Sequence, residues 1–279
     1  MPRGLFFSLL LVAAMAGFAA ETVKPVALEQ TPPAVQKTIQ AQIGKGKLGQ
    51  IEQQEEAGKT SFEVTFTAPT GEERDFSVAD DGSLLSVEVL LPETSAAVQK
   101  TIREQATGWE LRSIAKNVAE EEATFDVEVV KDGRVKTFTV ENDGDLSSME
   151  RTLAETPAAV QSAIKTQLAE GSVQSIYENF EEDGNSYEIE GATKAGVRKS
   201  FRLAPDGQLL TEEVTLDETP PAVRKTILEK IGNGKILRID KSWAKKTNGV
   251  LPYEVEGMKG GKPFDFSVGP HGKFLGRND

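Results

Sequence analysis

Apolar residues along the chain follow two different periods. In four segments they recur every four residues, which places them on one face of a helix; the first such segment carries Val35, Ile39 and Ile43. After each segment the period changes to two, as in Phe62-Glu63-Val64, which is typical of a strand with one buried face and one face in solvent. The pattern therefore predicts helices that are each followed by short antiparallel strands.

The same pattern occurs four times. The helical segment from Thr31 to Ile39 returns in similar form, and its valine recurs at intervals of 63, 62 and 63 residues, as Val35, Val98, Val160 and Val223. A period this regular indicates copies of one supersecondary unit. The copies also share a turn before the last strand, such as Asp81-Gly82, where glycine tolerates a positive φ.

We therefore expect an α+β fold of four tandem repeats, each with one helix packed on a three- or four-stranded antiparallel meander. The expected repeats cover 21–91, 92–153, 154–216 and 217–279. Trp243 shares the parity of Ile239 in the first strand of its repeat, so it is expected in the core. The helices are expected to begin at N-cap threonines, which are Thr31, Thr94, Thr156 and Thr219.

Residues 1–20 are expected to form a signal peptide rather than part of the fold. Arg3 gives a positive start, and Leu5 to Met15 is mostly apolar but too short to span a bilayer. Small residues then allow cleavage after Ala19 or Ala20. An uncleaved membrane anchor is the alternative. No later segment is apolar enough to span a membrane, so the protein is expected to be periplasmic or secreted.

The chain is acidic and has no cysteine. It carries 32 basic and 44 acidic residues, for a net charge of −12. Such a chain repels nucleic acid and anionic lipid, so the expected partners are cations or basic proteins. An acidic surface also simply favours solubility. Without cysteine there is no disulfide, lipoprotein anchor, thiol nucleophile or thiolate metal site.

The sequence shows no catalytic motif, and we expect neither an enzyme nor a cofactor. His271 is the only histidine and replaces the aspartate of the turn before the last strand, so it is expected to be a turn residue. No nucleophile elbow and no phosphate-binding glycine loop is present. The loop Asn142-Asp143-Gly144-Asp145 has a faint likeness to a calcium loop but lacks the spaced ligands of an EF-hand. We therefore expect no metal site.

Acidic residues alternate with the core residues of the second strand in every repeat. They are expected on the solvent face of the sheet. This face either keeps the protein soluble or binds a cation or a basic protein. The residues of this predicted acidic face are Glu63, Asp126, Glu128, Glu188, Glu190, Glu254 and Glu256.

Two aromatic residues break the repeat pattern. Trp109 stands where the other copies have glycine, and Tyr177 lies on the solvent-facing parity of its strand. Aromatic residues of this kind are typical anchors of protein interfaces. The alternative is that they fill gaps against a neighbouring repeat.

The repeats resemble the PepSY-like family, which includes domains that are similar to β-lactamase inhibitor proteins. The matching features are the Pro-Ala-Val-x-x-x-Ile helix, a strand such as Tyr253-Glu254-Val255-Glu256, and the Asp-Gly turn before a Leu-Leu strand. The resemblance implies a secreted or periplasmic binding module, in some relatives one that restrains a protease or binds an enzyme surface. The disulfides of the β-lactamase inhibitors are absent here.

The function expected from the sequence is that of a non-catalytic periplasmic or secreted protein-binding module. The partner would be a protein such as an envelope or secreted enzyme, and the module itself a monomer. The alternative is a structural or cation-buffering acidic protein of the envelope. Aromatic anchors that differ between repeats favour the first hypothesis, whereas interchangeable acidic faces favour the second.

Overall fold

The computed structural model describes residues 22–56, 59–119, 122–182, 184–244, 249–260 and 262–276. The predicted signal peptide at 1–20 lies outside these residues. The chain forms two compact units, unit 1 up to Ser147 and unit 2 from Ser148 onward. None of the helices in the described ranges is long and apolar enough to cross a membrane.

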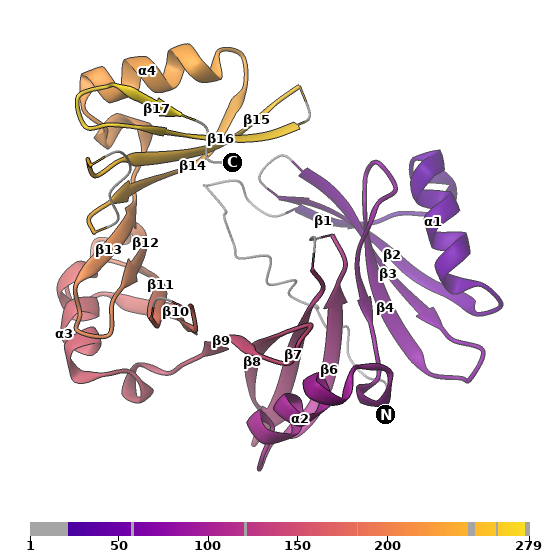
Figure 1. Ribbon diagram of the computed structural model, residues 1–279. Helices are drawn as coiled ribbons and strands as arrows, with labels where there is room; N and C mark the ends of the chain where they lie inside the picture. Colours follow the sequence, from indigo (N-terminus) through magenta and orange to yellow (C-terminus); the bar gives the residue numbers. More distant parts are fainter. Residues whose placement is uncertain are drawn as a thin grey trace. The chain divides into compact units, whose positions relative to one another are not determined.

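In unit 1 each α-helix follows a short 3-10 helix (Figure 1). The helices are η1 (Leu28–Gln30), α1 (Pro33–Ile43), η2 (Leu91–Glu93) and α2 (Ala96–Gln105). The strands are β1 (Thr22–Pro25), β2 (Lys47–Glu56), β3 (Lys59–Thr67), β4 (Glu73–Ala79), β5 (Leu84–Glu88), β6 (Glu110–Asn117), β7 (Thr124–Lys131) and β8 (Arg134–Glu141), and β9 (Leu146–Glu150) spans the boundary between the units.

Unit 2 has the same order of elements. Its helices are η3 (Leu153–Glu155), α3 (Ala158–Gln167), η4 (Leu216–Glu218) and α4 (Pro221–Ile231). Its strands are β10 (Ser172–Asn179), β11 (Ser186–Ala192), β12 (Arg198–Leu203), β13 (Leu209–Glu213), β14 (Lys235–Ser242), β15 (Tyr253–Lys259), β16 (Lys262–Val268) and β17 (Phe274–Gly276).

The expected fold class, four tandem repeats that each pack one helix on a three- or four-stranded meander, is wrong. Hydrogen bonds join the strands of the described residues into one 17-stranded antiparallel sheet. The last strand before each later helix pairs with the first strand after it, as in the pairs Glu88–Ala115 of β5–β6 and Glu213–Asp240 of β13–β14. These pairings satisfy the backbone groups that separate meanders would leave open at their edges. The expected repeat boundaries stay predictions.

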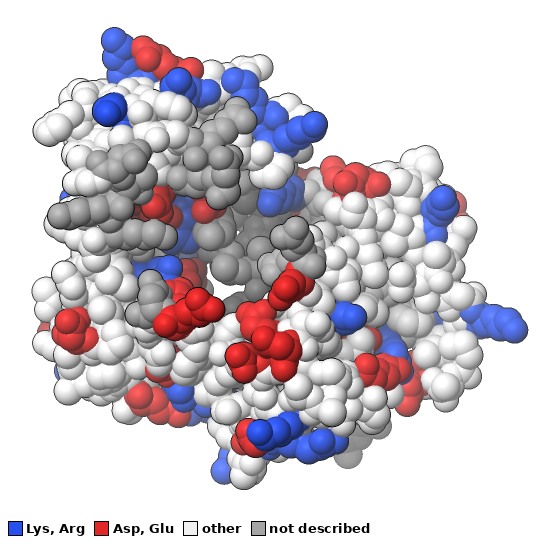
Figure 2. All heavy atoms as spheres, viewed as in Figure 1, with Lys and Arg blue, Asp and Glu red and all other residues white. Residues whose placement is uncertain are grey.

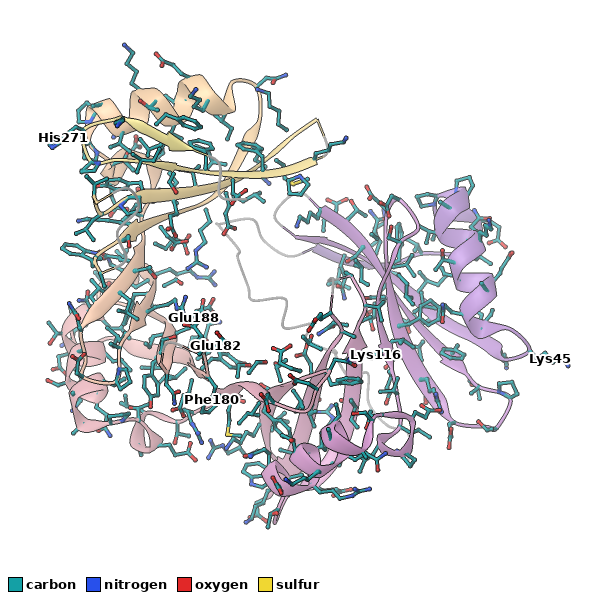
Figure 3. The ribbon with its side chains drawn as sticks, viewed as in Figure 1. Lys45, Lys116, Phe180, Glu182, Glu188 and His271 are labelled. Carbon is teal, nitrogen blue, oxygen red and sulfur yellow. The ribbon has the colours of Figure 1, made fainter. Side chains whose placement is uncertain are left out.

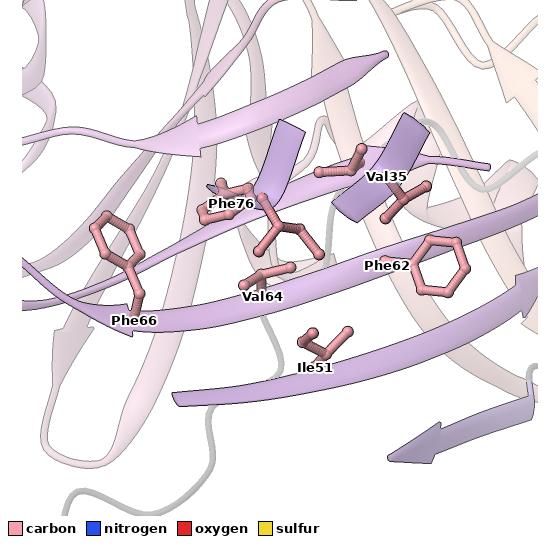
Figure 4. Packing of buried hydrophobic residues seen from close by; sticks show 8 residues of the cluster. Val35, Ile51, Phe62, Val64, Phe66 and Phe76 are labelled. Atoms are coloured by element: carbon pink, nitrogen blue, oxygen red, sulfur yellow. The ribbon is translucent and has the colours of Figure 1, made fainter. Parts of the chain in front are cut away.

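The apolar residues of each helix pack on one face of the sheet. Around α1, Val35 and Ile39 are both fully buried against Ile51, Phe62 and Phe76 of the adjacent strands (Figure 4). In unit 2, α3 and α4 form two further buried clusters of the same kind with the strands that follow them. The apolar residues that recur every four positions in the helices thus pack in the core against those that alternate in the strands. The other side of the sheet carries polar residues.

The Asp-Gly turns lie against the first turn of the helices. A Cβ atom at Gly82 would lie only 2.7 Å from the Cβ of Ala34 in α1, and Gly82 has φ of 88°. The Thr38 hydroxyl donates a hydrogen bond of 2.6 Å to the Gly82 carbonyl. Glycine is therefore required by both conformation and space. The same close approach joins Gly144 to Ala97, Gly207 to Ala159 and Gly272 to Ala222.

The threonines expected to be N-caps are not N-caps. The Thr31 hydroxyl donates to the carbonyl of Leu28, at 2.8 Å, and thereby closes the preceding 3-10 turn. The N-cap position itself belongs to the residue that follows each threonine, and only Ser95 uses its side chain there, accepting from the Val98 amide. The expectation failed because the 3-10 turn before each threonine was not predicted. Thr94, Thr156 and Thr219 make the same hydrogen bond as Thr31.

The expectation that Trp243 lies in the core is also wrong. Its side chain is 42% exposed, and the Lys241 ammonium lies 3.7 Å from the ring centroid. Strand β14 ends one residue earlier, at Ser242. Beyond the last paired residue, alternation along a strand no longer decides which side a residue faces.

Candidate functional site

The acidic residues predicted on the solvent face alternate with buried core residues but are not fully exposed. In β3, for example, Glu63 is half-buried between the buried Phe62 and Val64. The other six, Asp126, Glu128, Glu188, Glu190, Glu254 and Glu256, are half-buried as well. Carboxylates at this depth interact with their neighbours more strongly than carboxylates in open solvent.

A buried arginine lies among the acids of unit 2. Arg238 in β14 is only 5% exposed, and its Nε atom is 2.6 Å from Oδ2 of Asp240. Glu188 of β11 and Glu213 of β13 approach the guanidinium to 3.9 and 4.0 Å. Ser200 of β12 accepts a hydrogen bond of 3.4 Å from Nη2. With two further carboxylates that interact with the arginine, these residues form the Arg238 cluster, which comprises Arg238, Glu188, Glu190, Glu213, Asp240 and Glu256.

Strand register assembles this cluster. Arg238 and Asp240 flank the core residue Ile239, so both point to the side opposite α4. Arg238 is paired with Glu256 of β15, and Asp240 with Glu213 of β13. In Figure 3 the Glu188 side chain likewise lies on the side of β11 away from α3. Figure 2 shows acidic side chains gathered beside β10 and β11.

The cluster carries more negative than positive charge, and burial makes that charge costly. Burial raises the pKa of Glu190, Glu213 and Glu256, while the Arg238 guanidinium lowers each of them. For Arg238, burial lowers the pKa, but the neighbouring Asp240 carboxylate and the other acids reverse this effect and raise it overall. Arg238 therefore stays charged and offsets part of the repulsion between the carboxylates around it.

The corresponding acids of unit 1 have different partners. Asp126 accepts hydrogen bonds from Asn117 at 2.9 Å and from Thr139 at 2.8 Å. Glu128 is 3.4 Å from Arg112. Glu63 has no such donor or cation within the described part of the chain, and burial followed by repulsion from neighbouring carboxylates raises its pKa to about 8. The repeat position shared by Glu63, Asp126 and Glu188 thus supports three different electrostatic arrangements.

The two predicted anchor residues belong to different units. Tyr177 of β10 is half-buried and is paired with Glu188 of β11 and Glu150 of β9, so it adjoins the Arg238 cluster. Trp109, just before β6, is also half-buried, and the Arg134 guanidinium lies 5.8 Å from its ring centroid. The structure therefore brings Tyr177, but not Trp109, next to the acids of unit 2 through β-sheet pairing.

Arg238 is the residue that the sequence interpretation missed. It occupies the position before the buried isoleucine of the first strand, where the other copies have Gln50, Ser113 and Ser175. A search for charged residues that break the repeat would have found it, as the search for aromatic residues found Tyr177.

The described residues contain no group of three or more histidine, aspartate or glutamate side chains arranged to hold a metal ion. His271 is exposed in the turn before β17, as the sequence suggested, and Figure 3 labels it at the edge of unit 2. The carboxylates of the Arg238 cluster surround one guanidinium that remains protonated, and they present a negatively charged surface that can attract a cation or a basic group.

Comparison with known proteins gives only partial structural matches. No family model and no curated protein matches the chain. A protein from Bacteroides eggerthii that is named as periplasmic shares 19% identity at a TM-score of 0.33, over 43% of this chain and 87% of its own. A DUF2874-family protein from Bacteroides vulgatus, also named as periplasmic, shares 13% identity at a TM-score of 0.29, over 46% and 97%. A BLIP-like protein from Bacteroides fragilis shares 18% identity at a TM-score of 0.31, over 43% and 84%.

Periplasmic is also the location expected from the N-terminal segment of this chain. At these identities and TM-scores the matches assign no partner and no activity to it. The resemblance to the PepSY-like family therefore stays a prediction.

Proposed function

We propose that this protein is a non-catalytic periplasmic or secreted module that binds another protein through the face of unit 2 formed by Tyr177 and the Arg238 cluster. The observation that carries the proposal is the set of carboxylates held around Arg238. This arginine is only 5% exposed. A buried cation holds the acidic side chains in place, so they need little ordering when a partner arrives.

The partner that fits this face is a protein with a basic surface. The carboxylates outnumber the single guanidinium, and Tyr177 supplies an aromatic surface beside them. Aromatic rings attract cations and are common anchors in interfaces. An envelope or secreted enzyme, such as a protease that the module restrains, is the partner class we propose, and the module acts as a monomer.

The alternative is an acidic envelope protein that buffers cations. It requires acids that are interchangeable between repeats. The different partners of Asp126 and Glu188 favour the binding module, because only the latter adjoins both an arginine and an aromatic residue.

The experiment is capture of the protein's partner from its own envelope and secreted fractions, followed by affinity measurement with the purified partner. Tyr177→Ala should weaken binding by roughly thirtyfold, since an aromatic anchor contributes about 2 kcal/mol. Its melting temperature should stay nearly unchanged. Added salt should weaken the wild-type complex, because the recognition is electrostatic.

The matched control is Glu229→Gln, which removes an exposed acid from α4 on the opposite side of the sheet. It should bind like the wild type. The proposed face is wrong if Tyr177→Ala and Glu229→Gln bind equally well. A large drop in the melting temperature of Tyr177→Ala with intact binding would show instead that Tyr177 is a packing residue.

A further inference from the structure

For Glu63, neither a cation nor a hydrogen-bond donor is found among the described residues. Its Oε2 atom is buried and has no hydrogen-bond partner. In the sheet register it is paired with Glu52 of β2 on one side and with Ser77 of β4 on the other. Like charges directly opposite each other destabilise a sheet.

The hydroxyl paired with Glu63 bonds to a neighbouring serine and not to Glu63 Oε2. The Ser77 hydroxyl forms a hydrogen bond of 2.9 Å with the Ser86 hydroxyl of β5. At the corresponding position of β8, Thr139 instead donates to Asp126 at 2.8 Å. The same position in the repeat therefore satisfies an acid in one copy and leaves it without a donor in the other.

All charged groups that influence Glu63 from the adjoining strands are acids. They are Glu52 of β2, Asp75 of β4 and Glu88 of β5. Asp75 is itself half-buried, and its Oδ1 atom also has no hydrogen-bond partner. A carboxylate in such surroundings is stabilised by taking up a proton, which removes the repulsion and provides a donor.

We propose that Glu63 is a proton-binding site that makes unit 1 pH-sensitive, so that the sheet formed by β2 to β5 is most stable with Glu63 protonated and loses stability as the pH rises from acidic to slightly alkaline values. This inference concerns a different site from the proposed binding face and does not depend on it. Burial raises the pKa of Glu63 to about 8, which places the transition near neutral pH.

The sign of the effect follows from proton linkage. Below the ordinary pKa of 4.5, Glu63 is protonated in both the folded and the unfolded chain. Between 4.5 and about 8 it is protonated only in the folded chain, so each added pH unit favours unfolding by up to about tenfold. Above about pH 8 both states have lost the proton, and this contribution stays constant.

The test is urea unfolding of the whole chain with Trp109 as the reporter. The protein has two tryptophans, so Trp243→Phe leaves Trp109 of unit 1 as the sole tryptophan, whose fluorescence is excited selectively. In this background, Glu63→Gln should match the parent at pH 5 and be more stable at pH 8. Asp126→Asn is the matched control: it removes an acid that has donors, so it should lower stability at pH 8.

Two results would overturn the proposal. One is a pH profile of Glu63→Gln that runs parallel to that of its parent, or lower stability of this variant at pH 8. The other comes from the unaltered protein, in case the variant does not fold: carbon NMR of the Glu63 carboxyl should show a titration midpoint above pH 7. A midpoint near 4.5 would refute the proton site.

Discussion

Replacing Arg238 by methionine tests whether the buried arginine holds the acids of unit 2 together. Methionine replaces the aliphatic stem of arginine with an apolar chain, so the change chiefly removes the guanidinium. Glu188, Glu213 and Asp240 then lose the cation that lies within 2.6 to 4.0 Å of them.

The expected loss of stability can be estimated from how deeply these charged side chains are buried. Removing one partner of a buried ion pair costs about 3–5 kcal/mol, because the other charge is left uncompensated. The acids reach some solvent, with side chains 14% to 26% exposed, so we expect about 2–4 kcal/mol. For a unit of this size that corresponds to a fall of roughly 10 °C in melting temperature.

The loss should depend on pH in a defined direction. Without Arg238, the pKa values of Glu190, Glu213 and Glu256, which burial already raises, rise further, because the guanidinium lowers them. A carboxyl group with a raised folded-state pKa stabilises the fold less as the pH rises through that range. The variant should therefore be most destabilised at neutral pH and least near pH 4, where the acids are protonated.

The assay is urea unfolding followed by the fluorescence of Trp243, which lies in unit 2, with Trp109 replaced by phenylalanine. Arg112→Met of unit 1 is the matched control, followed by Trp109 with Trp243 replaced by phenylalanine, because Arg112 lies 3.4 Å from Glu128 and its side chain is 23% exposed. That change should cost about 1 kcal/mol or less. The reasoning fails if Arg238→Met is as stable as its parent at pH 7, or if its loss is the same at pH 4.

Two further predictions concern the turns and the acids. Gly82→Ala should cost about 3 kcal/mol in urea unfolding, since its Cβ would overlap Ala34, whereas Gly71→Ala, with φ of 92° but open space around it, should cost only about 1 kcal/mol; equal losses would mean that the helix contact is unimportant. Calcium should bind weakly or not at all, because the acids are spread over several strands rather than gathered in one loop; calorimetry that finds a stoichiometric micromolar site would favour the cation-buffering alternative.

Helix and strand faces could be predicted from the sequence, but strand neighbours could not. Val35 and Ile39 repeat every four residues and are buried as expected. Alternation along β5, in contrast, predicts which side of the sheet Val87 faces. It does not predict which strand pairs with the free edge of β5. That information lies in the register between β5 and β6, which pairs Val87 with Lys116 across an intervening helix. For this reason one continuous sheet could not be predicted in place of four repeats.

The sequence predicts which face of the sheet carries these acids, but it does not predict the electrostatic partners of each acid. Acids at the positions of Glu63, Asp126 and Glu188 could be placed on the face opposite the helices from parity alone. Whether each acid is satisfied depends on residues of other strands, such as Thr139 for Asp126 and Arg238 for Glu188. These partners are distant in sequence, so a pattern within one strand carries no sign of them.

The exceptions to the repeat are therefore the better guide to function. An acid that recurs in every copy is explained by the need for a polar residue on the uncovered face of the sheet, and it requires no partner. Maintenance of the fold does not explain Arg238. A buried charge is costly, and an uncharged residue fits the same position in other repeats, as Ser175 and Gln50 show. Its placement next to Tyr177 joins two departures from the repeat on one face of unit 2. A binding face explains why two independent departures from the repeat lie next to each other, whereas maintenance of the fold does not require them to.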